Sequence, residues 1–207
     1  RREEGPRGRV EGQEPDALPQ GNVNLGLNYS DVTASNIEGD VVVAGAKRAR
    51  ISNVTGAVDL TAANASNGLV ELRDISGQVK VNAPFCRITA QGLDQLADLR
   101  TEHSPGVDVS RSASVVIDAP HSDVRARNID GDLRILSSNS NLQISSVSGR
   151  LQVQGQQTSV NAEDVKGNIT IETTHGDVAL KNFFEDVHVE TSYRDVTLTT
   201  ASEPARD

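Results

Sequence analysis

The sequence predicts an all-β fold, a single-domain parallel β-solenoid (β-helix) of about ten coils of ~18 residues. First, Gly131, Gly149 and Gly167 lie eighteen residues apart, and an alternating pair of apolar residues follows each of them. Second, taking the glycine position as zero, apolar residues recur at plus 2, 4, 11, 13 and 16, the period-2 signal of strands with one buried face. Third, only 2% of the residues are aromatic, so Val, Ile, Leu and Ala must fill a thin interior.

The composition divides the 207-residue chain into three parts. Residues 1–20 are rich in Pro, Gly and charge, which predicts a linker with little regular structure or a partial N-terminal cap, in which 17–19 cover the first coil. Residues 21–200 form the solenoid, and 201–207 a C-terminal tail. Because the chain begins at Arg1 without an apolar signal segment, we expect an excised, soluble piece of a longer protein, with any signal peptide or anchor outside it.

The five apolar positions can be followed in order through ten coils. The first coil starts at Gly21 and fits throughout, the second has a one-residue deletion, and the third carries three extra residues. In the fifth coil the return strand is displaced by one, to Val107 and Val109, so we expect a bulge or bent turn beside Pro105 and Gly106. The pattern persists where another residue replaces the glycine, namely at Gln95, Ala113 and Glu185.

Short polar residues recur at two further positions of the repeat. Such side chains hydrogen-bond to nearby backbone and tolerate unusual φ angles, so both sets predict turns at the corners of the coils. The set at plus 10 precedes the return strand and includes Asp31, Asp123, Asn141, Ser159, Asp177 and Asp195. The set at plus 15 forms a predicted corner ladder of Asn36, Asn53, Asp74, Ser110, Asn128, Ser146, Asp164 and Asn182.

The repeat resembles a family of bacterial adhesin-like β-strand-repeat domains of unknown function, related to the heads of autotransporter adhesins. The segments NIDGDLRI, SVSGRLQV and DVKGNITI carry this resemblance, which extends over about residues 21–200. It implies a β-helical fold and an extracytoplasmic location, in the periplasm or at the cell surface. It brings no catalytic residues with it.

One pair of carboxylates could act as catalytic residues. Asp177 and Asp195 occupy the same position of adjacent coils, about 5 Å apart, a separation that retaining glycoside hydrolases use. The same column carries Asp31 and Asp123, so a turn-forming role explains the pair more economically.

A pair of histidines, His103 and His121, lies at plus 8 of adjacent coils and could hold a metal ion. Without a third ligand, exposed turn histidines are the simpler interpretation, and we expect no metal and no cofactor. Cys86 is expected to be a small half-buried apolar residue, and the basic run 47–50 a solvated face.

The net charge of −9 argues against nucleic acid as a partner. No apolar run approaches the ~18 residues that cross a bilayer, so we expect no direct membrane insertion by this segment. Two function classes remain. The first is a non-catalytic envelope or surface module that binds a protein or a surface glycan, or associates end to end. The second is a carbohydrate-active or carbohydrate-binding β-helix with an acidic side groove.

Overall fold

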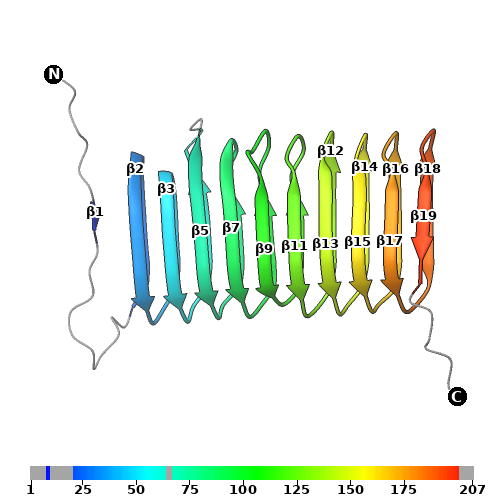
Figure 1. Ribbon diagram of the computed structural model, residues 1–207. Helices are drawn as coiled ribbons and strands as arrows, with labels where there is room; N and C mark the ends of the chain where they lie inside the picture. The colour runs from blue at the N-terminus through cyan, green and yellow to red at the C-terminus, as the bar shows by residue number, and fades with distance from the viewer. Residues whose placement is uncertain (1–7, 10–20, 64–66, 201–207) are drawn as a thin grey trace, which may run out of the picture.

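The computed structural model describes residues 8–9, 21–63 and 67–200, and these ranges contain strands and turns but no helix. The strands lie side by side in chain order and form a straight rod (Figure 1). They are β1 (Gly8–Arg9), β2 (Val23–Ile37), β3 (Val41–Val54), β4 (Val58–Ala62), β5 (Gly68–Ile75), β6 (Val79–Asn82), β7 (Cys86–Leu93), β8 (Ala97–Arg100), β9 (Val107–Ser112), β10 (Val115–Asp118), β11 (Val124–Ile129), β12 (Leu133–Ser138), β13 (Asn141–Val147), β14 (Leu151–Gln156), β15 (Ser159–Val165), β16 (Ile169–Thr174), β17 (Val178–Phe183), β18 (Val187–Ser192) and β19 (Val196–Thr199).

Every pairing between these strands is parallel and joins one coil to the next. Leu133 of β12 pairs with Leu151 of β14, which pairs in turn with Ile169 of β16. The even-numbered strands from β4 to β18, with the first half of β2 and β3, form what we call the first wall. The odd-numbered strands from β5 to β19, with the second half of β2 and β3, form the second wall. The predicted parallel β-solenoid of about ten coils is therefore confirmed.

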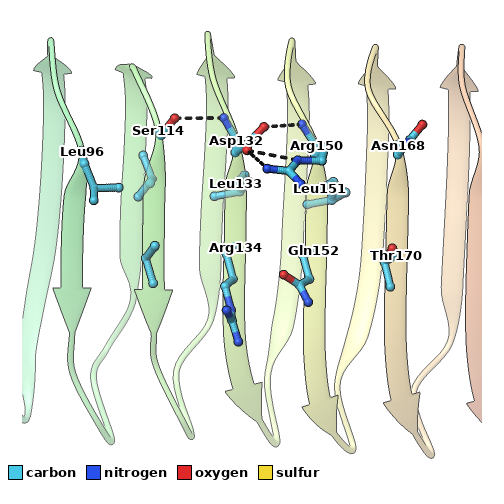
Figure 2. Close-up of a pocket in the computed structure, with 12 residues that line it drawn as sticks. Leu96, Ser114, Asp132, Leu133, Arg134, Arg150, Leu151, Gln152, Asn168 and Thr170 are labelled. Atoms are coloured by element: carbon cyan, nitrogen blue, oxygen red, sulfur yellow. Dashed lines mark hydrogen bonds and ion pairs between the residues drawn. The ribbon is translucent and has the colours of Figure 1, made fainter.

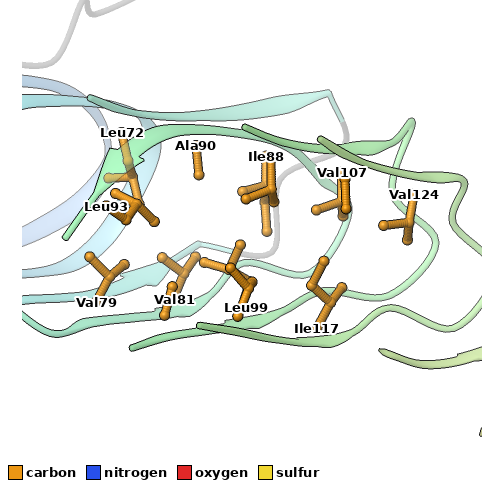
Figure 3. Close-up of a cluster of buried hydrophobic side chains, with 14 of the residues drawn as sticks. Leu72, Val79, Val81, Ile88, Ala90, Leu93, Leu99, Val107, Ile117 and Val124 are labelled. Atoms are coloured by element: carbon orange, nitrogen blue, oxygen red, sulfur yellow. The ribbon is translucent and has the colours of Figure 1, made fainter. Parts of the chain in front are cut away.

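The apolar columns of the two walls face each other across the interior. Val79, Leu99 and Ile117 of the first wall point toward Ile88 and Val107 of the second (Figure 3). All five side chains have an exposed fraction of 2% or less, and they belong to one continuous core. A coil of two short strands could not bury its own apolar face, so the stacking of neighbours is what stabilises the fold.

Hydroxyl groups replace apolar side chains where the first wall turns into the second. Ser104, Ser122 and Ser140 are buried at the same position of successive coils. The Ser104 N–H donates to Ser122 Oγ at 2.9 Å, and the Ser122 N–H donates to Ser140 Oγ at 3.1 Å. Within the described residues no buried side-chain polar atom lacks a hydrogen-bond partner. These serines therefore serve as side-chain acceptors for turn amides that cannot join a strand ladder.

The predicted corner ladder is left-handed in backbone conformation at seven of its eight members. Two of the amides also bond to each other, since Asn53 Nδ2 donates to Asn36 Oδ1 at 3.0 Å. The φ values are 56° at Asn36, 53° at Asn53, 53° at Asp74, 53° at Asn128, 57° at Ser146, 57° at Asp164 and 54° at Asn182.

The prediction for the eighth member, Ser110, is wrong. Ser110 lies on strand β9 and pairs with Gln91 and Arg127, while the left-handed corner residue of that coil is Arg111, with φ 50°. The displaced return strand explains the error, because one extra residue before Val107 shifts every later position of the coil by one.

The N-terminal segment contains one strand that the sequence analysis did not predict. Gly8 and Arg9 of β1 pair in parallel with Val32 and Thr33, on the second-wall half of β2. The predicted cap at 17–19 and the tail at 201–207 lie outside the described residues, as does 64–66 in the long third coil.

Candidate functional site

The two predicted catalytic aspartates lie on adjacent coils, both exposed. Asp177 and Asp195 precede Val178 and Val196, which pair in register. The backbone carbonyl of Asp195 accepts a hydrogen bond from the Val178 N–H at 3.0 Å, and that of Asp177 accepts one from Val160 at 2.9 Å. Their main-chain atoms thus close the turn into the second wall, which is the structural role that the repeat itself suggests.

A shallow groove of about 360 Å³ lies on the second wall beside this column. Asp177 lines it and Asp195 does not, so the groove does not unite the two carboxylates. At its other end Asp123 Oδ1 accepts hydrogen bonds from the backbone N–H of Asn141, at 3.0 Å, and from its Nδ2, at 3.3 Å. The other polar side chains of the groove are Gln143, Ser159 and Asn161.

The two histidines are stacked face to face. The ring centroids of His103 and His121 are 4.5 Å apart with 21° between the planes, and Phe85 continues the stack at 5.8 Å. Imidazole lone pairs lie in the plane of the ring, so parallel stacked rings do not direct two of them at one ion. No group of three metal-ligating side chains occurs among the described residues.

These rings belong to a second left-handed corner at plus 8 that the sequence analysis did not recognise. The φ angles are 60° at Phe85, 49° at His103 and 56° at His121. His175 and Tyr193 form a similar stack further along, with centroids 5.0 Å apart. The stacked rings pack neighbouring turns against each other, which gives the histidines a structural role.

The outer face of the first wall is hollowed to about 620 Å³ near its middle (Figure 2). Asp132 and Arg150 form an exposed ion pair there, with Oδ2 and Nη2 2.8 Å apart, and the Arg150 backbone N–H also donates to Asp132 Oδ1 at 2.8 Å. The side-chain and backbone hydrogen bonds from Arg150 lower the pKa of the Asp132 carboxyl. Such contacts join neighbouring coils and contribute little stability, as is usual for exposed pairs.

Arginines gather on the outer face of the second wall, whereas the sequence predicted only that the basic run 47–50 is a solvated face. Arg48 and Arg50 lie on β3, Arg73 on β5 and Arg87 on β7, and all four are exposed. Two more, Arg125 and Arg127, lie on β11, four strands away from β3. The sequence gives little sign of this cluster, because its members come from four different coils.

The last described coil is open on one side. Val196 and Leu198 of β19 are 42% and 50% exposed, whereas Val178 and Leu180, in the same columns one coil earlier, are 1% and 2% exposed. Strands β18 and β19 pair only with β16 and β17 among the described residues. Apolar side chains and unpaired backbone groups therefore occur together at this end.

Cys86 is fully buried rather than half-buried, and burial raises the pKa of its thiol. A buried neutral thiol is a poor nucleophile, which agrees with its interpretation as a small apolar residue. No helix of the length and apolarity needed to cross a membrane is found in the described ranges.

Comparison of the chain with protein-family models, with curated proteins and with solved structures finds no match.

Proposed function

We propose that the solenoid is a non-catalytic, adhesin-like module of the bacterial cell envelope or surface, which joins other proteins through an open coil end or a sheet face. The observation that carries the proposal is the exposure of Val196 and Leu198 in columns that are buried elsewhere in the rod. The resemblance of the repeat to adhesin-like strand repeats supports the extracytoplasmic location.

The open end has the chemistry of a strand-addition site. The free edges of β18 and β19 offer N–H and C=O groups in the direction of the rod axis, where another strand can add to the sheet. Such a strand would also cover Val196 and Leu198. A second copy of the chain is a suitable partner, because Val23 and Leu25 of the first coil and Val187 and Val189 of the last occupy the same two columns of the first wall, and all four are half-buried.

We expect the wild-type chain to associate end to end as its concentration rises, as measured by size-exclusion chromatography with light scattering. The double variant Val196→Lys, Leu198→Lys should stay monomeric, since two charges would have to be buried in the contact. Thr197→Lys is the matched control, because this exposed residue alternates with the two apolar ones on the same strand. A wild-type monomer at every concentration, or equal association by all three proteins, would contradict contact through this end.

A carbohydrate-active or carbohydrate-binding β-helix is the second candidate, and the groove that Asp177 lines is the observation that favours it. The stacked turn positions of Asp177 and Asp195 favour a structural role instead. We therefore expect no turnover in a screen of oligosaccharide substrates, for the wild type or for Asp195→Asn. Hydrolysis by the wild type that Asp195→Asn abolishes would establish the enzyme in place of the module.

A further inference from the structure

We propose that the outer face of the second wall binds an acidic polysaccharide, a sugar polymer that carries carboxylate groups at intervals along its chain. This surface is separate from the coil end and does not depend on contact there. The residues that carry the proposal, named here the arginine face, are Arg48, Arg50, Arg73, Arg87, Arg125 and Arg127.

The strands that carry the arginine face have a net charge opposite in sign to that of the whole chain. Strands β3, β5, β7, β9 and β11 hold eight basic residues and three acidic ones, a net charge of +5, while the chain has a net charge of −9. The side chains of the arginine face alternate with buried ones, as Arg125 and Arg127 do with Val124 and Ala126. They must therefore project from the outer surface of the sheet.

Most of these guanidinium groups are not neutralised by a carboxylate. Arg87 Nη2 donates to the carbonyl oxygen of Pro105 at 3.3 Å, and Arg125 Nε donates to Gln143 Oε1 at 3.0 Å. Arg73 and Arg127 make no side-chain hydrogen bond or ion pair within the described part of the chain.

The two arginines of β3 are the ones that face carboxylates. Arg50 Nε lies 2.6 Å from Glu71 Oε2, and Arg48 Nη1 lies 3.8 Å from Asp31 Oδ2. The Arg48–Asp31 pair is exposed and the Arg50–Glu71 pair is open to solvent on the arginine side, and ion pairs so placed are weak enough to exchange partners with a ligand. The face thus offers several guanidinium groups to an anion at little energetic cost.

The arrangement of the arginines suits an extended ligand. Neighbouring strands of a sheet lie about 4.8 Å apart, so the face from β3 to β11 extends over about 19 Å along the rod axis. Each guanidinium group presents a planar set of donors that matches a carboxylate in bidentate geometry. A flexible polymer with one carboxylate every sugar or two can contact several of these groups at once, and its affinity gains from that multivalency.

The neighbouring groove favours a sugar polymer over nucleic acid. Gln143, which accepts a hydrogen bond from Arg125, also lines the groove of about 360 Å³ on the next coils, beside Ser159 and Asn161. Amide and hydroxyl side chains suit sugar hydroxyls. Duplex DNA carries a charge every ~1.7 Å along its axis, and the acidic residues of the groove, Asp123 and Asp177, would repel so dense a polyanion.

Polygalacturonate is a suitable probe, with neutral dextran and duplex DNA beside it, in biolayer interferometry at two salt concentrations. We expect the wild type to bind polygalacturonate, more weakly in high salt, and to bind dextran and DNA at least tenfold less tightly. The variant Arg73→Gln, Arg125→Gln, Arg127→Gln should lose roughly tenfold to a hundredfold in affinity for polygalacturonate. Its melting temperature should stay unchanged, because these side chains are exposed.

The matched control removes the same charge from elsewhere on the rod, in the variant Lys80→Gln, Arg134→Gln, Lys166→Gln, whose three side chains are also exposed. We expect its affinity to remain within about threefold of the wild type, a loss that reflects net charge alone. Four results would overturn the proposal: no binding of polygalacturonate by the wild type, equal losses in the two triple variants, dextran bound as tightly as polygalacturonate, or DNA bound as tightly as polygalacturonate.

Discussion

Replacement of Leu151 by aspartate is expected to lower the free energy of unfolding by at least about 4 kcal/mol. The Leu151 side chain is 1% exposed, and it lies between Leu133 and Ile169 in one column of the first wall. An ionised carboxylate there would have no partner and no water. The change falls in the eighth coil, so it would interrupt the stack on which the coils after it depend.

The neighbouring substitution Gln152→Asp is the control, because Gln152 lies on the outer surface of the same strand. It should change the free energy of unfolding by no more than about 0.5 kcal/mol. Urea denaturation followed by circular dichroism measures both variants. A denaturation midpoint for Leu151→Asp equal to that of the wild type would contradict the inward position of the column.

Gly149→Ala is expected to destabilise the rod by about 3 kcal/mol, although it adds only one methyl group. A Cβ atom at this position would lie 2.5 Å from the backbone carbonyl carbon and oxygen of Gly131, one coil earlier. Backbone atoms held by parallel ladders on both sides cannot move away freely. Glycine is therefore favoured at this position because the two successive corners approach each other closely.

Gly26→Ala is the matched control, since a Cβ atom at Gly26 would meet no heavy atom within 4 Å. That substitution should leave stability unchanged or raise it by up to about 1 kcal/mol, through the smaller entropy of the unfolded chain. Thermal unfolding of both variants tests the idea. Equal melting temperatures would show that the close approach at Gly149 is relieved at no cost.

The five apolar columns could be predicted from the sequence because two patterns, alternation within a coil and repetition between coils, assign the same residues to the interior. Where that agreement fails, the prediction fails as well. In the fifth coil, counting from Gln95 assigned the corner to Ser110, whereas the strand register assigns it to Arg111. A single inserted residue does not alter the apolar pattern of a strand, but it moves the later turn residue of the same coil.

The corner at plus 8 could not have been predicted from residue types. Phe85, Gln157 and Tyr193 have left-handed φ angles there, and none of them has an intrinsic preference for that conformation. Their conformation is imposed by neighbouring coils that hold both flanking strands. By contrast, Asn128 and Asp164 at the other corner belong to the residue types that tolerate such angles, so that corner was visible in the sequence.

The arginine face could not be predicted from the sequence, for a related reason. Arg73 and Arg127 are 54 residues apart in the sequence and lie three strands apart on one sheet. Each of them alone is an ordinary exposed residue on the polar side of a strand. Only the strand register, which aligns equivalent positions of successive coils, reveals that residues from four coils form one surface.

The constant period of eighteen residues over most of the rod makes its length adjustable in equal steps. Insertion or removal of one complete coil would change the distance between the two ends by about 4.8 Å, and every remaining strand would keep its direction and its register. The solenoid can therefore act as a molecular ruler. Whatever is attached at its two ends would be held at a separation set by a whole number of coils.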